Sequence, residues 1–186
     1  MKWQIDKSFD FCYGHRVHNQ TLNAEFSLDS CLACRHLHGH QGKIKIILEG
    51  DELHQGMVTD FKHLNWFKVF LDDVLDHKFI MDVSDPLVPH EVPELMLADD
   101  YTTFDPDACI LHNEGYLTPR MDLLSHLPQA VQEKYEGMVF VDFVPTSENL
   151  SAWLLDIAQQ KMAELGVKVV AVDFWETPKS HCKVEV

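Results

Sequence analysis

Residues 145–166 read PTSENLSAWLLDIAQQKMAELG, and this stretch predicts the clearest helix in the chain. Thr146 or Ser147 can cap its start, and Gly166 can end it. Between these signals, apolar side chains recur at helical spacing and predict one buried face: Leu150, Trp153, Leu154, Ile157 and Leu165. A helix with a single apolar face needs a sheet or another helix to cover that face.

Strand-like segments lie on both sides of this helix. Residues 167–177, VKVVAVDFWET, predict a strand rich in β-branched residues, and residues 181–186, HCKVEV, predict a short final strand. Residues 2–11, KWQIDKSFDF, alternate as a strand does, and residues 42–50, GKIKIILEG, form a strand bounded by glycines. Asp60 can cap another helix, whose apolar positions recur at helical spacing: Phe61, Leu64, Phe67, Leu71, Val74 and Leu75.

The order of these elements is strand, strand, helix, helix, strand, strand. It predicts an α+β fold, with an antiparallel four-stranded sheet and two helices on one face. Residues 1–186 are expected to form a single domain. Residues 81–144 lie between the two helices as a long insertion, which we expect to fold onto the core. Within it, residues 121–137 predict a broken helix and residues 138–144, MVFVDFV, a strand.

The charge of the chain is concentrated in this insertion. The formal net charge is −15, and residues 81–144 alone carry 2 basic and 13 acidic residues, a net −11. No basic stripe is present to neutralise phosphates, so nucleic acid is not an expected partner.

The sequence also predicts a cytoplasmic protein. The N-terminal MKWQIDKSFDF lacks the apolar core of a signal peptide, and no apolar run approaches membrane-spanning length. The five cysteines are an odd number, which favours free thiols in a reducing compartment.

Histidines and cysteines are crowded into residues 31–40, CLACRHLHGH. His38 and His40 are two residues apart, so they point to the same face if the second strand begins early enough to include them. A catalytic zinc takes three protein ligands and keeps one open position. His15, at the end of the first strand, is the expected third ligand because that strand should pair with the second; His18 is the fallback.

Other interpretations remain open at this point. With 12 histidines in the chain, His38 and His40 could form ordinary hydrogen-bonded or surface positions. Cys31 and Cys34 could instead join two histidines in a structural zinc site, although the spacing is tighter than in zinc fingers.

Six motifs occur in an order that resembles one enzyme family. They are FDFCYGHRV (9–17), CRHLHGH (34–40), GMVTDFKHL (56–64), LDHK (75–78), PTSENL (145–150) and ET (176–177). Over residues 1–80 and 145–186, the chain resembles the 6-pyruvoyltetrahydropterin synthase and 6-carboxytetrahydropterin synthase family. The resemblance implies the T-fold and a homo-oligomer, built of trimers that stack as hexamers with active sites at subunit boundaries. The long acidic segment 81–144 departs from compact members and could form a lid or a rim, or block the usual hexamer.

The resemblance also implies roles for individual residues. His15, His38 and His40 would bind Zn²⁺, and three residues would carry the proton transfers: Cys34, Asp76 and His77. Cys34 stands four residues before His38, where a thiolate near a metal can act as a base. His36, inside that spacer, is expected to be a bystander.

Three further residues would bind the substrate by the same resemblance: Glu176, Thr146 and Glu148. The Glu176 carboxylate would accept two N–H groups of a pterin ring. Thr146 and Glu148 also suit an ordinary helix start, where a threonine cap and an acidic first turn are common.

The implied substrate is 7,8-dihydroneopterin triphosphate, a small molecule. The leading reaction forms 6-carboxy-5,6,7,8-tetrahydropterin with loss of acetaldehyde and triphosphate, on the route to 7-deazaguanine and queuosine. The alternatives are 6-pyruvoyltetrahydropterin synthesis, which feeds tetrahydrobiopterin, and a non-catalytic zinc-binding T-fold protein. A zinc hydrolase is disfavoured because no His-Glu-x-x-His motif is present. The cations near the motifs that could bind the triphosphate are Arg16, Arg35, Lys43 and Lys78.

Overall fold

The structure is a computed structural model that describes all of residues 1–186. The strands are β1 (Trp3–His15), β2 (His38–Gly50), β3 (Lys78–Asp82), β4 (Met96–Leu97), β5 (Asp100–Phe104), β6 (Cys109–Leu111), β7 (Leu117–Pro119), β8 (Met138–Val141), β9 (Lys168–Thr177) and β10 (Ser180–Glu185). The α-helices are α1 (Asn65–Val74), α2 (Val88–Glu91), α3 (Met121–Leu124), α4 (Gln129–Glu136) and α5 (Ser147–Ala163), and short 3-10 helices are η1 (Ala33–Arg35), η2 (Phe61–Leu64), η3 (Pro93–Leu95) and η4 (Pro106–Ala108). None of these helices combines the length and apolar character that crossing a membrane requires.

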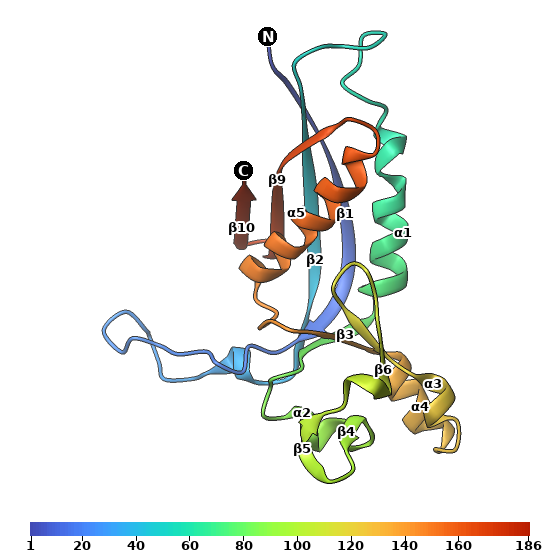
Figure 1. The fold of residues 1–186 in the computed structure, drawn as a ribbon. Helices are drawn as coiled ribbons and strands as arrows, with labels where there is room; N and C mark the ends of the chain where they lie inside the picture. Colours follow the sequence, from blue (N-terminus) through green and yellow to red (C-terminus); the bar gives the residue numbers. More distant parts are fainter. The chain divides into compact units, whose positions relative to one another are not determined.

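The chain divides into two compact units. The first unit comprises Met1–Tyr13, His40–Asp76 and Thr146–Val186, and the second unit comprises Gly14–Gly39 and His77–Pro145. Figure 1 traces the chain through the elements of both units.

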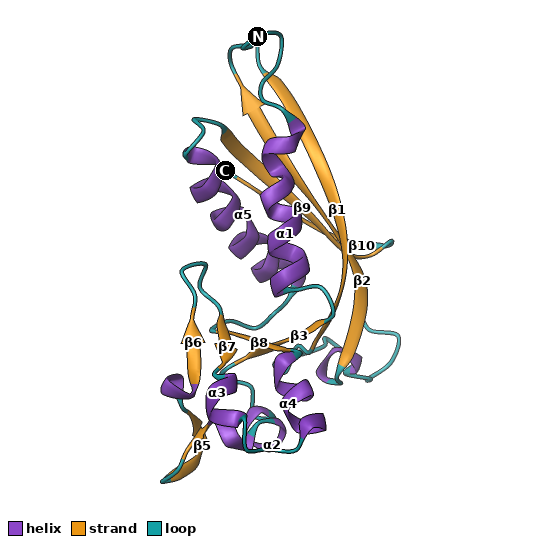
Figure 2. Cartoon of the chain, turned by 90° about the vertical axis from the view of Figure 1, so that its right-hand side faces the viewer, coloured by secondary structure: helices purple, strands orange, loops and turns teal.

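The first unit contains the strands and helices that the sequence predicts. In the strand order, β10, β9, β2 and β1 are consecutive neighbours, and β2 and β10 each pair with β9 in antiparallel fashion. Lys43 of β2 lies opposite Trp175 of β9, which fixes the register of that pair. Figure 2 shows α1 and α5 on the same side of these strands. The α+β class and the placement of both helices on one face are therefore confirmed.

The expected sheet of four antiparallel strands is wrong, because the sheet has eight strands in the mixed order β10-β9-β2-β1-β3-β8-β7-β6. The strand β3 follows α1 directly, and it pairs in parallel with β8, with Phe79 opposite Met138. Parallel neighbours need a long crossover connection, which residues 83–137 supply. The five-residue run KFIMD gives too short a pattern to reveal such a partner from sequence alone.

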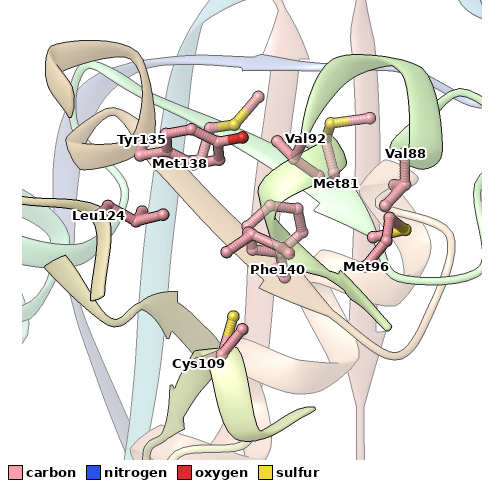
Figure 3. Packing of buried hydrophobic residues seen from close by; sticks show 11 residues of the cluster. Met81, Val88, Val92, Met96, Cys109, Leu124, Tyr135, Met138 and Phe140 are labelled. Atoms are coloured by element: carbon pink, nitrogen blue, oxygen red, sulfur yellow. The ribbon is translucent and has the colours of Figure 1, made fainter. Parts of the chain in front are cut away.

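The acidic segment builds a hydrophobic cluster of its own within the second unit (Figure 3). The cluster consists of Met81, Val88, Val92, Leu95, Met96, Ala108, Cys109, Leu124, Tyr135, Met138 and Phe140. The expected broken helix is present as α3 and α4, which are separated by a turn that ends at Pro128.

Burial raises the pKa of the Cys109 thiol to about 12. At neutral pH this thiol therefore stays protonated and packs as a small apolar side chain.

The helix α5 has a side-chain cap at its start, and it ends before Leu165. Thr146 is the N-cap, and its Oγ1 accepts a hydrogen bond from the Asn149 N–H at 3.2 Å. Leu154 is fully buried, as its place on the apolar face predicts. Leu165 is 54% exposed, because the helix ends at Ala163 and Leu165 lies in the turn that follows. The prediction that Leu165 lies on the buried face is therefore wrong.

These two leucines offer a matched test of the packing of α5. We expect Leu154→Ala to lower the free energy of unfolding by about 2–5 kcal/mol, because the truncation leaves a cavity in a buried site. We expect Leu165→Ala to change it by less than about 1 kcal/mol, because that side chain is largely in water. Urea denaturation followed by circular dichroism measures both values. Equal losses in the two variants would contradict the packing described for this helix.

Candidate metal and active site

Three imidazoles meet where β1 ends and β2 begins. The ligand nitrogens of His15, His38 and His40 lie within 4.8 Å of one another. His15 is fully buried, and the other two side chains are half-buried. Three neutral imidazoles that leave one position open form the ligand set of catalytic zinc sites. The donor set therefore fits a divalent metal such as Zn²⁺.

Backbone carbonyls orient two of these rings. Nδ1 of His15 lies 2.7 Å from the Pro145 carbonyl oxygen, and Nδ1 of His38 lies 2.7 Å from that of His36. A carbonyl oxygen only accepts hydrogen bonds, so each Nδ1 must donate and carry the proton. Nε2 then keeps its lone pair in both rings, which is the form that ligates a metal. The two ring centroids are 4.5 Å apart.

An acid and a phenol lie beside His40. Nε2 of His40 is 3.6 Å from Oε1 of Glu176, and its ring centroid is 5.8 Å from that of Tyr13. Burial, with the negative charge of Glu176 as a smaller cause, raises the pKa of the Tyr13 phenol far above its usual range. Tyr13 is therefore a neutral phenol at any physiological pH. Gly42 makes room for it, since a Cβ at that position would lie 2.9 Å from the Tyr13 ring.

Tyr13 is a site residue that sequence reasoning missed. A tyrosine on the inward face of a strand looks like any other core residue, and it belongs to no metal-ligand pattern. The available signal was alternation, since Phe9, Phe11 and Tyr13 all point inward and the last of them stands two residues before His15.

Cys34 lies in η1 and is half-buried. Its backbone N–H donates to Oε1 of Gln20 at 3.0 Å, and its carbonyl oxygen accepts from the Val17 N–H at 2.7 Å. The segment that holds Cys34 is therefore joined to the residues that follow His15. Cys31 is exposed and is not among the residues that the metal cluster brings together.

Asp76 and His77 follow the end of α1. Oδ1 of Asp76 accepts a hydrogen bond from the backbone N–H of Cys12 at 2.6 Å, which ties the helix end to β1. His77 has a φ of 58° and an exposed side chain. This left-handed conformation is uncommon outside glycine, and such residues cluster at functional sites. The backbone conformation therefore marks His77 as a candidate site residue, which its position at a helix end does not.

Thr146 and Glu148 have contacts that belong to the start of α5. Thr146 is the N-cap, and Glu148 is an exposed residue of the first turn that accepts from Oγ of Ser147 at 3.2 Å. These contacts account for both residues as helix-start residues. Their role in substrate binding stays a prediction.

Two residues near His15, Arg16 and His18, have acidic partners. His18, the fallback ligand, is not part of the three-histidine cluster, and its Nε2 lies 3.0 Å from Oδ2 of Asp82. Arg16, a candidate for triphosphate binding, has its Nε 3.0 Å from Oδ2 of Asp85. Both acids are almost fully buried.

Of the other expected cations, Arg35 and Lys78 donate hydrogen bonds to backbone carbonyl oxygens. Arg35 donates to the carbonyl oxygen of Gln20 at 2.9 Å, and Lys78 donates to that of Glu136 at 2.7 Å. Lys43 is exposed on β2. Binding of a triphosphate by these groups stays a prediction.

Comparison with known proteins identifies the class to which this fold and site belong. A family model described as "6-pyruvoyl tetrahydropterin synthase" matches residues 4–186. The chain belongs to this family, as its motifs predict. It is therefore an enzyme of the tetrahydropterin synthase family, whose substrates are small molecules. The match includes residues 81–144, so that segment is not outside the family pattern.

A curated relative and two solved structures resemble this chain over nearly its whole length. The 6-carboxy-5,6,7,8-tetrahydropterin synthase of Aquifex aeolicus is 34% identical over 196 residues, covering 98% of this chain and 98% of that protein. The crystal structure of an uncharacterized protein from Wolinella succinogenes is 51% identical, with a TM-score of 0.92 and coverage of 100% of this chain and 98% of that one. The 6-pyruvoyl tetrahydropterin synthase of Caenorhabditis elegans shares the fold at 17% identity, with a TM-score of 0.55 and coverage of 100% and 96%.

The cluster predicts which histidine substitution removes the metal. After dialysis against Zn²⁺ and then against buffer, we expect the wild-type chain to retain about one ion, as a set of three histidine ligands should. His38→Ala should retain close to none, because two imidazoles bind far more weakly than three. Elemental analysis by mass spectrometry measures the content.

His36→Ala is the matched control for this test. It removes an exposed imidazole two residues away and leaves in place the backbone carbonyl that orients His38. It should keep the wild-type metal content. Metal loss in His36→Ala, or full retention in His38→Ala, would contradict the assigned cluster.

Proposed function

We propose that this chain is a zinc-dependent 6-carboxytetrahydropterin synthase. With one molecule of water, it converts 7,8-dihydroneopterin triphosphate to 6-carboxy-5,6,7,8-tetrahydropterin and releases acetaldehyde and triphosphate, in the biosynthesis of 7-deazaguanines such as queuosine. The gathering of His15, His38 and His40 within 4.8 Å carries the proposal. The name of the Aquifex aeolicus relative, matched over nearly its whole length, supports the carboxy-forming branch.

In this proposal, His15, His38 and His40 hold Zn²⁺ through ring nitrogens. When bound, Zn²⁺ supplies a Lewis acid that lowers the pKa of hydroxyl groups placed against it. The two backbone carbonyls that accept from Nδ1 of His15 and of His38 keep these rings in the ligating tautomer.

Cys34, Asp76 and His77 carry the proton transfers. The Cys34 thiolate takes a proton from the substrate side chain, which prepares the loss of triphosphate. His77 gives and takes protons near neutral pH, since imidazole is the side chain suited to that range. Asp76 accepts a hydrogen bond from the Cys12 N–H, which holds the end of α1 against β1. This contact fixes the backbone position of His77, the next residue.

Glu176, Thr146 and Glu148 bind the pterin. The Glu176 carboxylate accepts two N–H groups from the pterin ring, a planar bidentate match. Its 3.6 Å distance from His40 supports this role, because it places the pterin anchor next to the proposed metal ligands. Thr146 and Glu148, at the start of α5, would line the pterin pocket.

We further propose that residues 1–186 act as one pterin-synthase-like domain, with residues 81–144 as its insertion. The single family model across residues 4–186 supports this. The protein would work in the cytoplasm as a homo-oligomer, a trimer or a hexamer, without nucleic-acid or membrane partners.

Product identification tests the reaction. The purified zinc-loaded protein is incubated with 7,8-dihydroneopterin triphosphate, and acetaldehyde, triphosphate and pterin products are measured by chromatography and mass spectrometry. We expect all three products in equal amounts. Triphosphate without acetaldehyde would replace the proposal by 6-pyruvoyltetrahydropterin synthesis. Bound zinc with no product at all would support a non-catalytic zinc-binding protein.

A cysteine substitution tests the role of Cys34. Cys34→Ala should lower kcat by about 10³-fold or more, because the chain then lacks the thiolate that takes the substrate proton. Its zinc content should equal that of the wild type, since Cys34 is not among the three clustered ligands.

Cys31→Ala is the matched control, because it removes an exposed thiol three residues earlier in the same segment. It should keep wild-type turnover and zinc content. Turnover that survives in Cys34→Ala would eliminate the role assigned to that thiol.

A further inference from the structure

Two buried acids close the turn that follows β3. Asp82 is 4% exposed and Asp85 is 2% exposed. One oxygen of each carboxylate holds the turn itself: Oδ1 of Asp82 accepts from the Ser84 N–H, and Oδ1 of Asp85 accepts from the Leu87 N–H, both at 2.8 Å. Each acid therefore has a second oxygen for another partner. A buried charge is tolerated only where it is paired and hydrogen-bonded.

The second oxygens meet the segment that follows His15. Oδ2 of Asp82 lies 3.0 Å from Nε2 of His18, and Oδ2 of Asp85 lies 3.0 Å from Nε of Arg16. The side chains of Arg16 and His18 are 15% and 16% exposed. Asp82 and Asp85 thus contact residues 16–18 through two side-chain pairs that are largely screened from water.

The same short segment also holds Cys34. Val17 donates its N–H to the Cys34 carbonyl oxygen, and Gln20 accepts from the Cys34 N–H. The Gln20 carbonyl oxygen accepts from both Nε and Nη2 of Arg35, at 2.9 and 2.7 Å. Four hydrogen bonds therefore join η1 to residues 17–20. All of these residues belong to the second unit.

We propose that Asp82 and Asp85 are positioning residues for Cys34. They anchor residues 16–20, and residues 16–20 in turn hold the thiol-bearing turn η1. The acidic segment then has a function in the active site, although neither acid is assigned a contact with substrate. This inference rests on the proposed function in naming Cys34 as the reactive group.

Loss of either carboxylate charge is expected to displace Cys34 locally. Removing one partner of a buried ion pair leaves the other charge without compensation, so the local structure relaxes toward water. The relaxation reaches Cys34 through two hydrogen bonds, one between its carbonyl oxygen and the Val17 N–H and one between its N–H and the Gln20 side chain. A catalytic group displaced by about 1 Å can lose up to about 100-fold in rate, even when the substituted residue lies away from the chemistry.

The test uses Asp85→Asn, with Asp82→Asn as a second variant in case the first does not fold. Asparagine keeps the shape of the side chain and removes its charge. Asp122→Asn is the matched control, since it removes a charge of the same segment that is 63% exposed and paired with Arg120 at the surface.

Four quantities are measured on each folded, zinc-loaded full-length chain: kcat and KM with 7,8-dihydroneopterin triphosphate, zinc content, and the rate at which iodoacetamide modifies each cysteine. Peptide mass spectrometry separates the five thiols. Cys109 reports on the packing of the second unit, because it is only 7% exposed inside the hydrophobic cluster of that unit.

We expect the Asn variants to lose about tenfold or more in kcat, with KM changed by less than about twofold. Modification of Cys34 should become about threefold faster or more, while Cys109 stays protected, because the opening is local. Zinc content should not change. Asp122→Asn should match the wild type in every measurement.

Two results would overturn the inference. One is wild-type kcat and wild-type Cys34 modification in both Asn variants. The other is a parallel rise in Cys34 and Cys109 modification in both, which would make the acids general stabilising residues. If the wild type shows no turnover, the proposed function fails, while the comparison of Cys34 with Cys109 still decides whether these acids hold η1.

Discussion

One hydrogen bond, from Nδ1 of His15 to the carbonyl oxygen of Pro145, is the constraint on which the site depends. It joins residues 130 positions apart in the sequence, at the end of β1 and just ahead of α5. It also selects the tautomer, because the carbonyl can only accept. Without it the fully buried imidazole could turn, and the three nitrogens would no longer face one another. The position of one nitrogen of the three-histidine cluster therefore depends on the carbonyl of the residue just before the helix cap.

The acidic segment is more closely integrated than its composition suggests. Most of its 13 acidic residues give the surface a negative charge, but Asp82 and Asp85 are buried and organise the residues after His15. The same segment supplies a hydrophobic cluster and the parallel partner of β3. A segment that contributes strands to the sheet is therefore part of the fold itself. The family match across residues 4–186 agrees with this.

Local patterns in the sequence were sufficient for a large part of the fold. The helical spacing around Leu154 and the alternation in residues 42–50 predicted elements that the structure contains, since both patterns report burial on one face. The His38–Gly39–His40 spacing, with the expected pairing of the first two strands, predicted the three histidines that the structure brings together. Their role as zinc ligands remains a proposal.

The rest depended on contacts between distant parts of the chain. The parallel pairing of β3 with β8 cannot be found from KFIMD, because a strand of five residues does not specify its neighbour. Asp82 and Asp85 look like ordinary loop acids until Arg16 and His18 are seen beside them. Tyr13 likewise gains its place in the site only from its position next to His40 and Glu176.

The left-handed backbone conformation of His77 lowers the stability of the fold relative to a glycine at the same position. A residue with a side chain costs about 1–2 kcal/mol in the left-handed region, whereas glycine adopts that region freely. A chain selected for robustness alone would favour glycine immediately after α1, where glycine commonly ends helices. Thermostabilising redesign guided only by backbone statistics would therefore replace the imidazole at position 77, the group to which the proposed reaction assigns proton transfer.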